Sequence, residues 1–393
     1  MLDALRGLAL LGILLANIND WSGWGSLRDP QKFALAGQAI ARAYDFLVAA
    51  LIEGKFYTIF SFLFGLGFSL QLARLERRGA DGVAIYRRRL LILLMFGLAH
   101  MLLIWEGDIL TLYALLGMLL PFARGWSDRR LIATAIVLIL LPIPGFALVH
   151  AANGDPDAGL IEVGERLFTA LGGDNAQAVM WRTREDWSSY FSFVLSGPPF
   201  RIGGFFESWR IPKVMGIMLI GLWTGRRLVA GTLLEDRAML KRIATAGLLI
   251  GVPVNLIYAT MGGLEQDGFG AGLTTTTLYA IGVVPLGLSY AACFALLWPK
   301  AKVFLGLLAA PGRMALTNYL LHSLLGVAIF YGIGFGLMAK LPPPGFIAIA
   351  FGIFSAQLVL SRWWLSHHAQ GPMEALWRRL TYGTRENRPT VAG

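Results

Sequence analysis

Long runs of apolar residues, separated by short polar segments, extend over most of the chain. Many of the runs approach ~20 residues, the length that an α-helix needs to cross the hydrocarbon core of a membrane. They do not show the short alternating pattern that is typical of transmembrane β-strands. The pattern therefore predicts an all-α protein, a polytopic transmembrane helical bundle that forms one integral membrane domain over residues 1–393.

The segment 86–130 sets the orientation of this bundle. It begins with three arginines, contains two apolar runs, and turns between them at the sequence Trp-Glu-Gly-Asp, residues 105–108. Further arginines follow the second run, so basic residues flank both open ends of a helical hairpin. Because cytoplasmic loops of membrane proteins are enriched in Lys and Arg, the open ends are expected in the cytoplasm and the turn outside.

The same rule gives about ten spans, with every arginine cluster on one side of the membrane. Both termini are then cytoplasmic, with a cytoplasmic tail at 367–393, and residues 151–212 form an extracytoplasmic loop with one or two amphipathic helices. Residues 34–52 contain charged side chains that are unfavourable at the bilayer centre, so we place them at the outer interface or as a re-entrant segment; a full crossing there would make eleven spans. The expected spans are 2–19, 55–75, the two limbs of the hairpin, 131–150, 214–229, 243–260, 273–298, 314–337 and 346–365.

Composition supports a membrane protein and excludes several other classes. Hydrophobic residues make up 56% of the chain and charged residues 15%, against about 25% charged in soluble domains. The net charge of +10 arises from basic residues in short loops, which indicates topology and not nucleic-acid binding. The single cysteine, Cys293, rules out a disulfide framework, and no metal-binding motif occurs. The first apolar run lacks a signal-peptide cleavage site, so we expect it to be retained.

A few polar residues within or beside the spans are candidates for chemistry. An ionisable residue inside a membrane is a functional candidate, although a neutral histidine can also be a structural hydrogen-bond partner. His100 lies in the first limb of the hairpin, and Asp108, at the turn, could orient its imidazole as a carboxylate does in a catalytic triad or simply cap the next helix. With Glu106 they form the candidate catalytic set. The candidate binding residues are Asp3, Arg6, Asn17, Lys55, Tyr113, Arg313, Asn318, Tyr319 and His322.

Because unpaired polar groups in hydrocarbon are unfavourable, these residues are expected to meet. The set predicted to line one intramembrane cavity is Asp3, Arg6, Asn17, His100, Asp108, Tyr113, Asn318 and Tyr319. No metal is expected there.

Five stretches of the chain resemble a known family. They are LDALRGLALLGILLANI, GKFYTIFSFLFGLGFSLQL, RRLLILLMFGLAHMLLIWEGDILTLYALLG, APGRMALTNYLLHSLLG and GPMEALWRRLTYG. They are similar to the YeiB-like family of bacterial inner-membrane proteins, which carries the domain of unknown function 418. The LDALRG pattern also resembles a wider superfamily of transmembrane acyltransferases. That resemblance implies a helical bundle with a central polar pocket, and acyl-CoA, such as acetyl-CoA, as the cytoplasmic acyl donor.

The chain departs from the heparan-type members of that superfamily at one point. Their catalytic histidine lies in the outer loop after the first span, whereas residues 19–56 contain no histidine. His100 or His322 would have to replace it, and the family often has glutamine where this chain has His322, which favours His100.

Two functions stay open at this stage. One is a membrane acyltransferase that moves an acyl group to an extracytoplasmic or membrane acceptor. The other is a transporter or exporter of a small polar or amphiphilic solute. The expected partners are the lipid bilayer and a small-molecule or lipid substrate, without nucleic acid; homo-oligomerisation is left open by the sequence.

Overall fold

The computed structural model describes residues 1–77, 79, 81–174, 178–231, 236–262 and 272–383, and every regular element in these ranges is helical, as predicted. The elements of the first half are α1 (Leu2–Trp21), η1 (Trp24–Ser26), α2 (Asp29–Ala36), α3 (Gln38–Leu47), η2 (Val48–Ile52), α4 (Lys55–Glu76), α5 (Gly82–Leu103), α6 (Leu110–Gly117), η3 (Leu120–Ala123), α7 (Asp128–Leu140) and α8 (Pro142–Ala151). Those of the second half are α9 (Ala158–Ala170), α10 (Ala178–Arg182), α11 (Trp187–Glu207), α12 (Arg210–Val229), α13 (Arg237–Thr260), α14 (Leu273–Gly306), α15 (Ala309–Arg313), α16 (Ala315–Phe330), α17 (Pro343–His367) and α18 (Pro372–Tyr382).

Six helical stretches of the described chain are long and apolar enough to cross a membrane. Two shorter apolar helices, Leu110–Ala123 and Ala315–Phe330, accompany them. Helices α5 and α12 have 22 and 20 residues but contain several arginines, so the count of about ten spans stays a prediction. The six stretches are Leu2–Trp21, Gln38–Glu76, Asp128–Ala151, Arg237–Thr260, Leu273–Gly306 and Pro343–His367.

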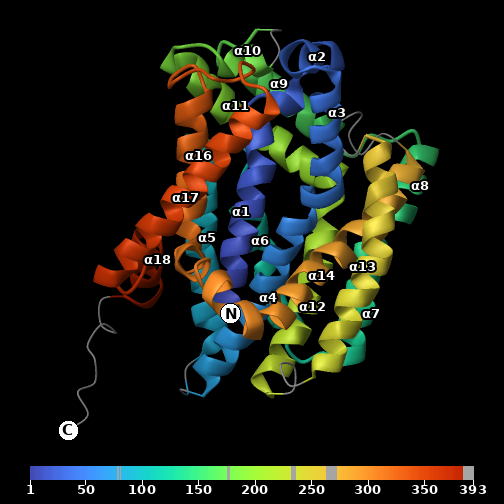
Figure 1. Ribbon diagram of the computed structural model, residues 1–393, viewed down its shortest axis with the longest axis vertical. Coiled ribbons are helices and arrows are strands. Elements are labelled where there is room, and N and C mark those ends of the chain that lie inside the picture. Colours follow the sequence, from blue (N-terminus) through green and yellow to red (C-terminus); the bar gives the residue numbers. More distant parts are fainter. Residues whose placement is uncertain (78, 80, 175–177, 232–235, 263–271, 384–393) are drawn as a thin grey trace.

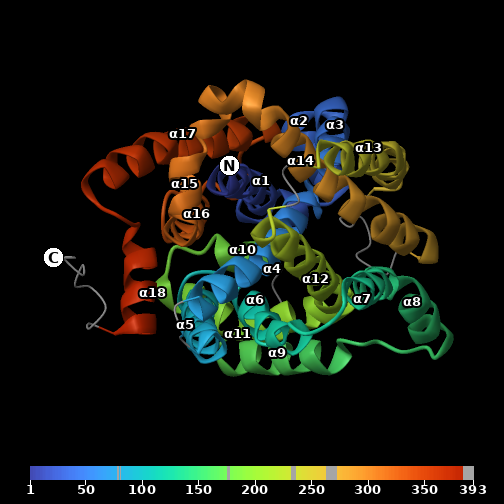
Figure 2. The ribbon, with the colours of Figure 1, turned by 90° about the horizontal axis from the view of Figure 1, so that it is seen from below.

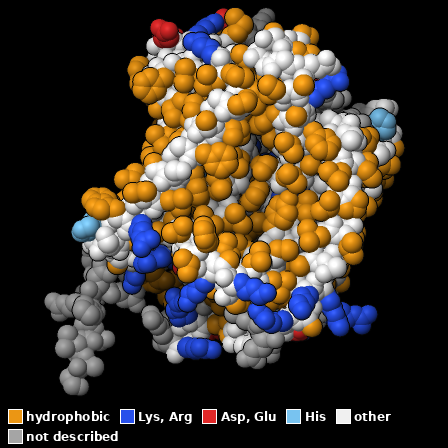
Figure 3. Space-filling model, in the orientation of Figure 1, with side chains coloured by type: hydrophobic (Ala, Val, Ile, Leu, Met, Phe, Trp, Pro, Cys, Tyr) orange, Lys and Arg blue, Asp and Glu red, His pale blue; other side chains and the backbone are white. Residues whose placement is uncertain are grey.

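The long helices run mainly along the long axis of the molecule (Figure 1). The amino terminus lies near the lower end, whereas α2, α9, α10 and α11 gather at the upper end. Viewed from below, α1 and α4 lie towards the middle, with α16 and α17 on one side and α7 and α13 on the other (Figure 2). Hydrophobic side chains cover the middle of the face in Figure 3, and Lys and Arg side chains concentrate at its lower end. This distribution is typical of a protein surrounded by lipid.

Helices α4 and α12 pack closely side by side and run in the same direction. A Cβ atom at Gly65 would lie 2.0 Å from the carbonyl oxygen of Met218, and one at Gly221 would lie 2.1 Å from the carbonyl oxygen of Phe62. Only glycine permits such an approach, which is how small residues hold membrane helices together. This contact fixes α4 and α12 as a parallel pair in the centre of the bundle.

Residues 34–52 take a path that the sequence did not specify. They form the end of α2, then α3 and the π-helical segment η2, and Gly54, with φ of 79°, separates them from α4. Figure 1 shows α3 descending from the upper end towards α4. The stretch Gln38–Glu76 is apolar enough to form one crossing, which favours counting 34–52 with α4 and not as an eleventh span.

Two other elements differ in length from the prediction. Helix α16 ends at Phe330, seven residues before the expected end of that span, because the chain turns and the Gly332 amide donates to the carbonyl oxygen of Arg182 at 2.9 Å. Helix α11 runs from Trp187 through Pro198 and Pro199 to Glu207, which is longer than the short amphipathic helices expected within 151–212. The segment 151–212 thus contributes a long helix to the bundle, and its extracytoplasmic location stays a prediction.

Candidate functional site

A buried hydroxyl–imidazole–carboxylate chain lies between α5, α6 and α16. His100 Nδ1 is 3.1 Å from Asp108 Oδ1, and His100 Nε2 is 2.8 Å from Ser323 Oγ. The side chains of His100 and Asp108 have no exposed surface, and Ser323 is 0% exposed. The structure thus places the expected histidine and carboxylate in contact and adds a serine, giving the connectivity of a catalytic triad.

The hairpin itself determines the geometry of the carboxylate. Helix α5 ends at Leu103, the chain turns, and Asp108 Oδ2 accepts the Thr111 amide at 2.7 Å. This bond satisfies a free backbone donor at the start of α6, so Asp108 contacts the imidazole and caps this helix at the same time. Arg201 of α11 holds the turn from outside by donating to the carbonyl oxygens of Gly107 and Asp108, at 3.1 and 2.8 Å.

Two aromatic residues enclose the imidazole. The Tyr319 ring lies with its centroid 5.3 Å from that of His100, one helical turn before Ser323 on α16. The Trp105 ring meets the imidazole edge-on at 6.2 Å. Because both rings are nearly fully buried, they exclude water from the imidazole and strengthen its hydrogen bonds.

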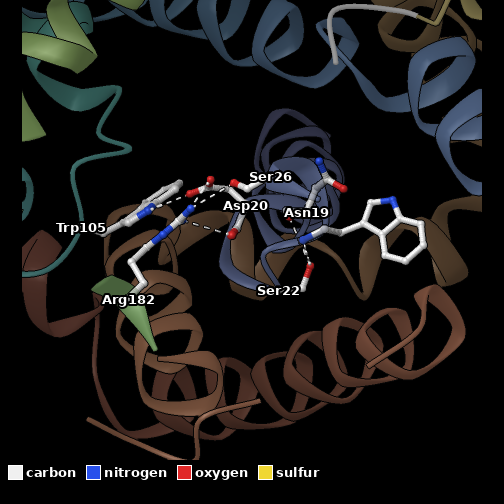
Figure 4. Close-up of polar contacts among 7 residues, drawn as sticks. Asn19, Asp20, Ser22, Ser26, Trp105 and Arg182 are labelled. Atoms are coloured by element: carbon white, nitrogen blue, oxygen red, sulfur yellow. Dashed lines mark hydrogen bonds and ion pairs between the residues drawn. The ribbon is translucent and has the colours of Figure 1, made fainter. Parts of the chain in front are cut away.

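Trp105 also takes part in a layer of polar contacts at the end of α1 (Figure 4). Asp20 accepts from Trp105 Nε1 and from Arg182 Nη1, both at 3.2 Å, and Arg182 Nη2 donates to Ser26 Oγ at 3.2 Å. Trp105 therefore connects these residues to the imidazole of His100. We call Asp20, Ser26, Trp105 and Arg182 the Asp20 layer.

Glu106 lies near the Asp20 layer, because Asp20 and Arg182 both act electrostatically on its carboxyl. Burial raises the pKa of its carboxyl to about 7, and the nearby Asp20 adds to the effect while Arg182 and Arg201 oppose it. A carboxyl in a poorly solvated site favours its neutral form. Its expected catalytic role beside His100 stays untested, and the structure gives the orienting contact to Asp108 alone.

Several predicted residues lie elsewhere, so the residues expected to line one cavity do not all meet. Asp3 and Arg6 pair with each other at 2.5 Å near the start of α1, ~26 Å along the helix from Asp20. Arg313 is exposed and donates to the carbonyl oxygen of Ala369. Asn17 is half-buried on α1.

Asn318 and His322 share a face of α16 but form a separate polar contact with α17. Asn318 Nδ2 donates to Ser361 Oγ and to the carbonyl oxygen of Pro311, both at 3.1 Å. His322 Nε2 lies 2.6 Å from Gln357 Oε1. These bonds join two helices in an apolar region, which is the structural role that polar side chains commonly have there.

Tyr113 contacts helix α4, and Lys55 contacts the segment η2 that precedes α4. Tyr113 hydroxyl contacts Ser61 Oγ at 2.9 Å and donates to the carbonyl oxygen of Tyr57 at 3.2 Å. Lys55 is 0% exposed and donates to the carbonyl oxygen of Ala49 at 2.5 Å. A second lysine, Lys213 of α12, is 1% exposed.

Sequence analysis missed Ser323, Arg201 and Lys213. Ser323 directly follows His322 in the polar stretch of α16. Its position one helical turn after Tyr319, on the same face, was the sequence signal that could have marked it as a candidate site residue. Arg201 and Lys213 fall in or beside 151–212, which was expected to be an outer loop, and no local pattern linked them to the hairpin.

Comparison with known sequences identifies the family. Residues 224–384 match the family described as protein of unknown function (DUF418). The uncharacterized protein YxaH of Bacillus subtilis is 32% identical over 97% of this chain and 94% of its own length. The uncharacterized protein YeiB of Escherichia coli is 28% identical over 97% of this chain and 95% of its own. The chain belongs to the DUF418, YeiB-like family. No solved structure matches it.

The two comparisons cover the candidate site differently. The DUF418 match contains Ser323 but begins after the hairpin that carries His100 and Asp108. The alignments to YxaH and YeiB extend over nearly the whole chain, including the hairpin. The candidate site of this DUF418 protein therefore joins the matched segment to the part of the chain before it.

Proposed function

We propose that this membrane protein is an acyltransferase in which Ser323 is the nucleophile, His100 its general base and Asp108 the group that orients the imidazole. The observation that carries the proposal is the engagement of both His100 ring nitrogens, one by a carboxylate and the other by a hydroxyl. This arrangement is how enzymes activate a serine that is otherwise a weak nucleophile.

The chemistry would proceed in two balanced steps. Ser323 Oγ attacks the thioester carbonyl of acyl-CoA while His100 Nε2 takes the hydroxyl proton; the C–S bond then breaks, and the thiolate leaves with that proton. An acceptor hydroxyl or amine next attacks the Ser323 ester, giving its proton to His100, which returns it to Ser323 as the ester bond breaks. Asp108 stabilises the imidazolium in both steps, and Tyr319 presents a phenol beside the ring that can donate to the oxyanion.

Acyl-CoA is proposed as the donor because the arginine-rich end of the hairpin can hold phosphates. A cavity of about 300 Å³ lies there, lined by Asp81, Val83, Arg87, Pro121, Phe122 and Arg124. Arginine binds phosphate through a planar fork of donors. Arg87 precedes His100 by thirteen residues of α5, ~20 Å along the helix, so an extended pantetheine arm would have to carry the acyl group inward.

The transporter alternative is favoured by a different observation. The path into α4 is interrupted at Gly54, and the path from α11 into α12 is interrupted at Trp209, whose φ of 48° is unusual for a bulky residue. Interrupted helices beside buried charges are typical of solute-binding sites in transporters. A carrier would need no serine nucleophile, and this difference separates the two functions.

The test is incubation of the purified protein with radiolabelled acetyl-CoA. We expect covalent label on the wild type that hydroxylamine releases and that maps to Ser323. Ser323→Ala and His100→Ala should both abolish it while the melting temperature stays close to wild type. Ser289→Ala is the matched control, since Ser289 is also 0% exposed but bonds only within α14.

Label that survives Ser323→Ala would remove the serine from the mechanism. If acetyl-CoA does not bind at millimolar concentration, the acyltransferase proposal fails and the carrier is favoured.

A further inference from the structure

Four basic side chains lie among aromatic rings inside the bundle. We call Lys55, Arg201, Arg210 and Lys213 the basic row. Lys55 and Lys213 are 0% and 1% exposed, and the two arginines are half-buried. A buried cation without sufficient counter-charge is unfavourable by several kcal/mol.

Aromatic rings link the members of the row. The guanidinium carbons of Arg201 and Arg210 lie 4.8 and 6.0 Å from the centre of the Phe205 ring, and that of Arg210 lies 5.5 Å from the Tyr57 ring. The Lys213 Nζ is 4.0 Å from the centre of the Tyr279 ring.

Two further contacts connect Lys55 and Arg210 to the Tyr279 ring. The Tyr57 and Tyr279 hydroxyls are 3.3 Å apart, and Lys55 Nζ lies 5.9 Å from the Tyr258 ring, which packs against Tyr279. All four cations thus lie next to one or more of these neighbouring aromatic rings.

The carboxylates that act on this row are already shared with other groups. Glu53 is the acid that acts on both lysines, and it also accepts from the Tyr258 hydroxyl at 2.8 Å. Asp108 and Asp20 act on Arg201, but Asp108 bonds to His100 and Asp20 bonds to Arg182. Among the described residues, the acids that act on these cations thus also serve Tyr258, His100 and Arg182.

Helix direction adds to the positive potential at the same place. Helices α4 and α12 begin at Lys55 and Arg210. They are parallel and in register, because Gly65 faces Met218 and Gly225 faces Ser69 further along, so their amino ends lie side by side. Each amino end carries about half a positive charge, and such ends favour anions.

We propose that the basic row binds the phosphate group of an amphiphilic substrate. A phosphate carries up to two negative charges and three or four acceptor oxygens, which match two lysines and the planar fork of Arg210. Cation–aromatic contacts keep the side chains in place before the ligand arrives.

Arg201 connects the basic row to the candidate site of Ser323, His100 and Asp108. It lies against the Phe205 ring beside Arg210 and donates to the Asp108 carbonyl oxygen. A phosphate bound to the row would position an acceptor next to Ser323. This acceptor role rests on the proposed function, whereas phosphate binding does not, so the two are measured separately.

Binding is tested on the full-length protein in non-ionic detergent by following its thermal unfolding with tryptophan fluorescence. The two probes are inorganic phosphate and phosphatidic acid in mixed micelles, with sodium chloride at equal ionic strength as the salt control. We expect a saturable rise in melting temperature with phosphate probes but not with chloride. Tighter apparent binding of phosphatidic acid supports an amphiphilic ligand. A response to inorganic phosphate alone would instead indicate a soluble phosphate ester and overturn the amphiphilic part of the proposal.

Lys213→Met should weaken the apparent affinity at least tenfold. Without phosphate, its melting temperature should equal or exceed that of wild type, because methionine fills the volume without a charge. Arg210→Lys, which keeps the charge and removes the fork, is the second variant and covers the case in which Lys213→Met does not fold. Arg129→Gln is the matched control, since Arg129 is exposed on α7.

Ser323→Ala should bind phosphate like wild type, which separates binding from turnover. The proposal is overturned if neither probe raises the melting temperature, or if Lys213→Met and Arg210→Lys both respond like wild type.

Discussion

His100 Nε2 lies 2.8 Å from the Oγ atom of Ser323, a residue 223 positions later in the chain. Asp108, on the other side of the ring, is only eight positions from His100. The candidate site therefore combines two kinds of contact. The His100–Asp108 contact is local to the hairpin, whereas the His100–Ser323 contact forms only when α16 packs against the hairpin.

Asp108→Asn should slow acyl transfer by about two or more orders of magnitude, because the amide would stabilise the imidazolium poorly and could favour the wrong tautomer. The asparagine oxygen can still accept the Thr111 amide, so the melting temperature should change little. Turnover of labelled acetyl-CoA and thermal unfolding give the two readouts. An unchanged rate would show that Asp108 acts only as a helix cap.

Glu106 should make stability depend on pH. Its pKa is raised from 4.5 to about 7 in the folded protein, so the fold binds its proton more tightly than the unfolded chain does. This carboxyl therefore lowers stability increasingly as the pH rises from 4.5 to 7, by a total on the order of 3 kcal/mol.

The Glu106→Gln variant should consequently melt higher than wild type at pH 8 and close to wild type at pH 4.5. Melting curves across this range check the prediction, with Glu185→Gln, at an exposed position of the same polar end, as the control. A constant difference between Glu106→Gln and wild type at all pH values would contradict it.

Gly65→Ala should destabilise the contact between α4 and α12, since the added Cβ would lie 2.0 Å from the Met218 carbonyl oxygen. Backbone atoms cannot move aside cheaply, so we expect a clear fall in melting temperature. Gly67→Ala is the control on the same helix: nothing lies within 4 Å of its Cβ, and alanine favours a helix over glycine by up to about 1 kcal/mol. Equal effects of the two substitutions would contradict the packing argument.

Cysteine labelling checks the topology that the arginine distribution predicts. In a Cys293→Ala background, Glu76→Cys, next to the arginine-rich loop, should react with a membrane-impermeant maleimide only after the cells are opened. Ala158→Cys, exposed at the start of α9, should react in intact cells. The opposite pattern would invert the orientation.

The sequence predicted those features that depend on residues close together in the chain. Apolar runs predicted the helices, and the polar turn predicted the hairpin in which His100 meets Asp108, because eight residues across a tight turn leave few alternatives. The break between α7 and α8 falls at Pro142, a residue that cannot continue the hydrogen bonding of a helix.

Contacts between distant segments were not predictable in this way. Ser323 looks like any small residue of a packed helix, and its place beside His100 depends on how α16 crosses α5. The segment 151–212 looked like a polar loop because its charged residues were counted as exposed, whereas Arg201 turns inward to the Asp108 carbonyl oxygen. Polar residues at the two ends of α1 share one helix but cannot share one site, since helical rise separates them.

The locality of the His100–Asp108 contact also bears on how the protein is made. The ribosome delivers the hairpin to the membrane roughly two hundred residues before Ser323 emerges. During that interval the imidazole and the carboxylate can hydrogen-bond to each other, and the carboxylate can also accept the Thr111 amide. The His100 imidazole and the Asp108 carboxylate, the two groups least favourable in lipid, can thus enter the membrane already hydrogen-bonded to each other. The Ser323 hydroxyl joins them later.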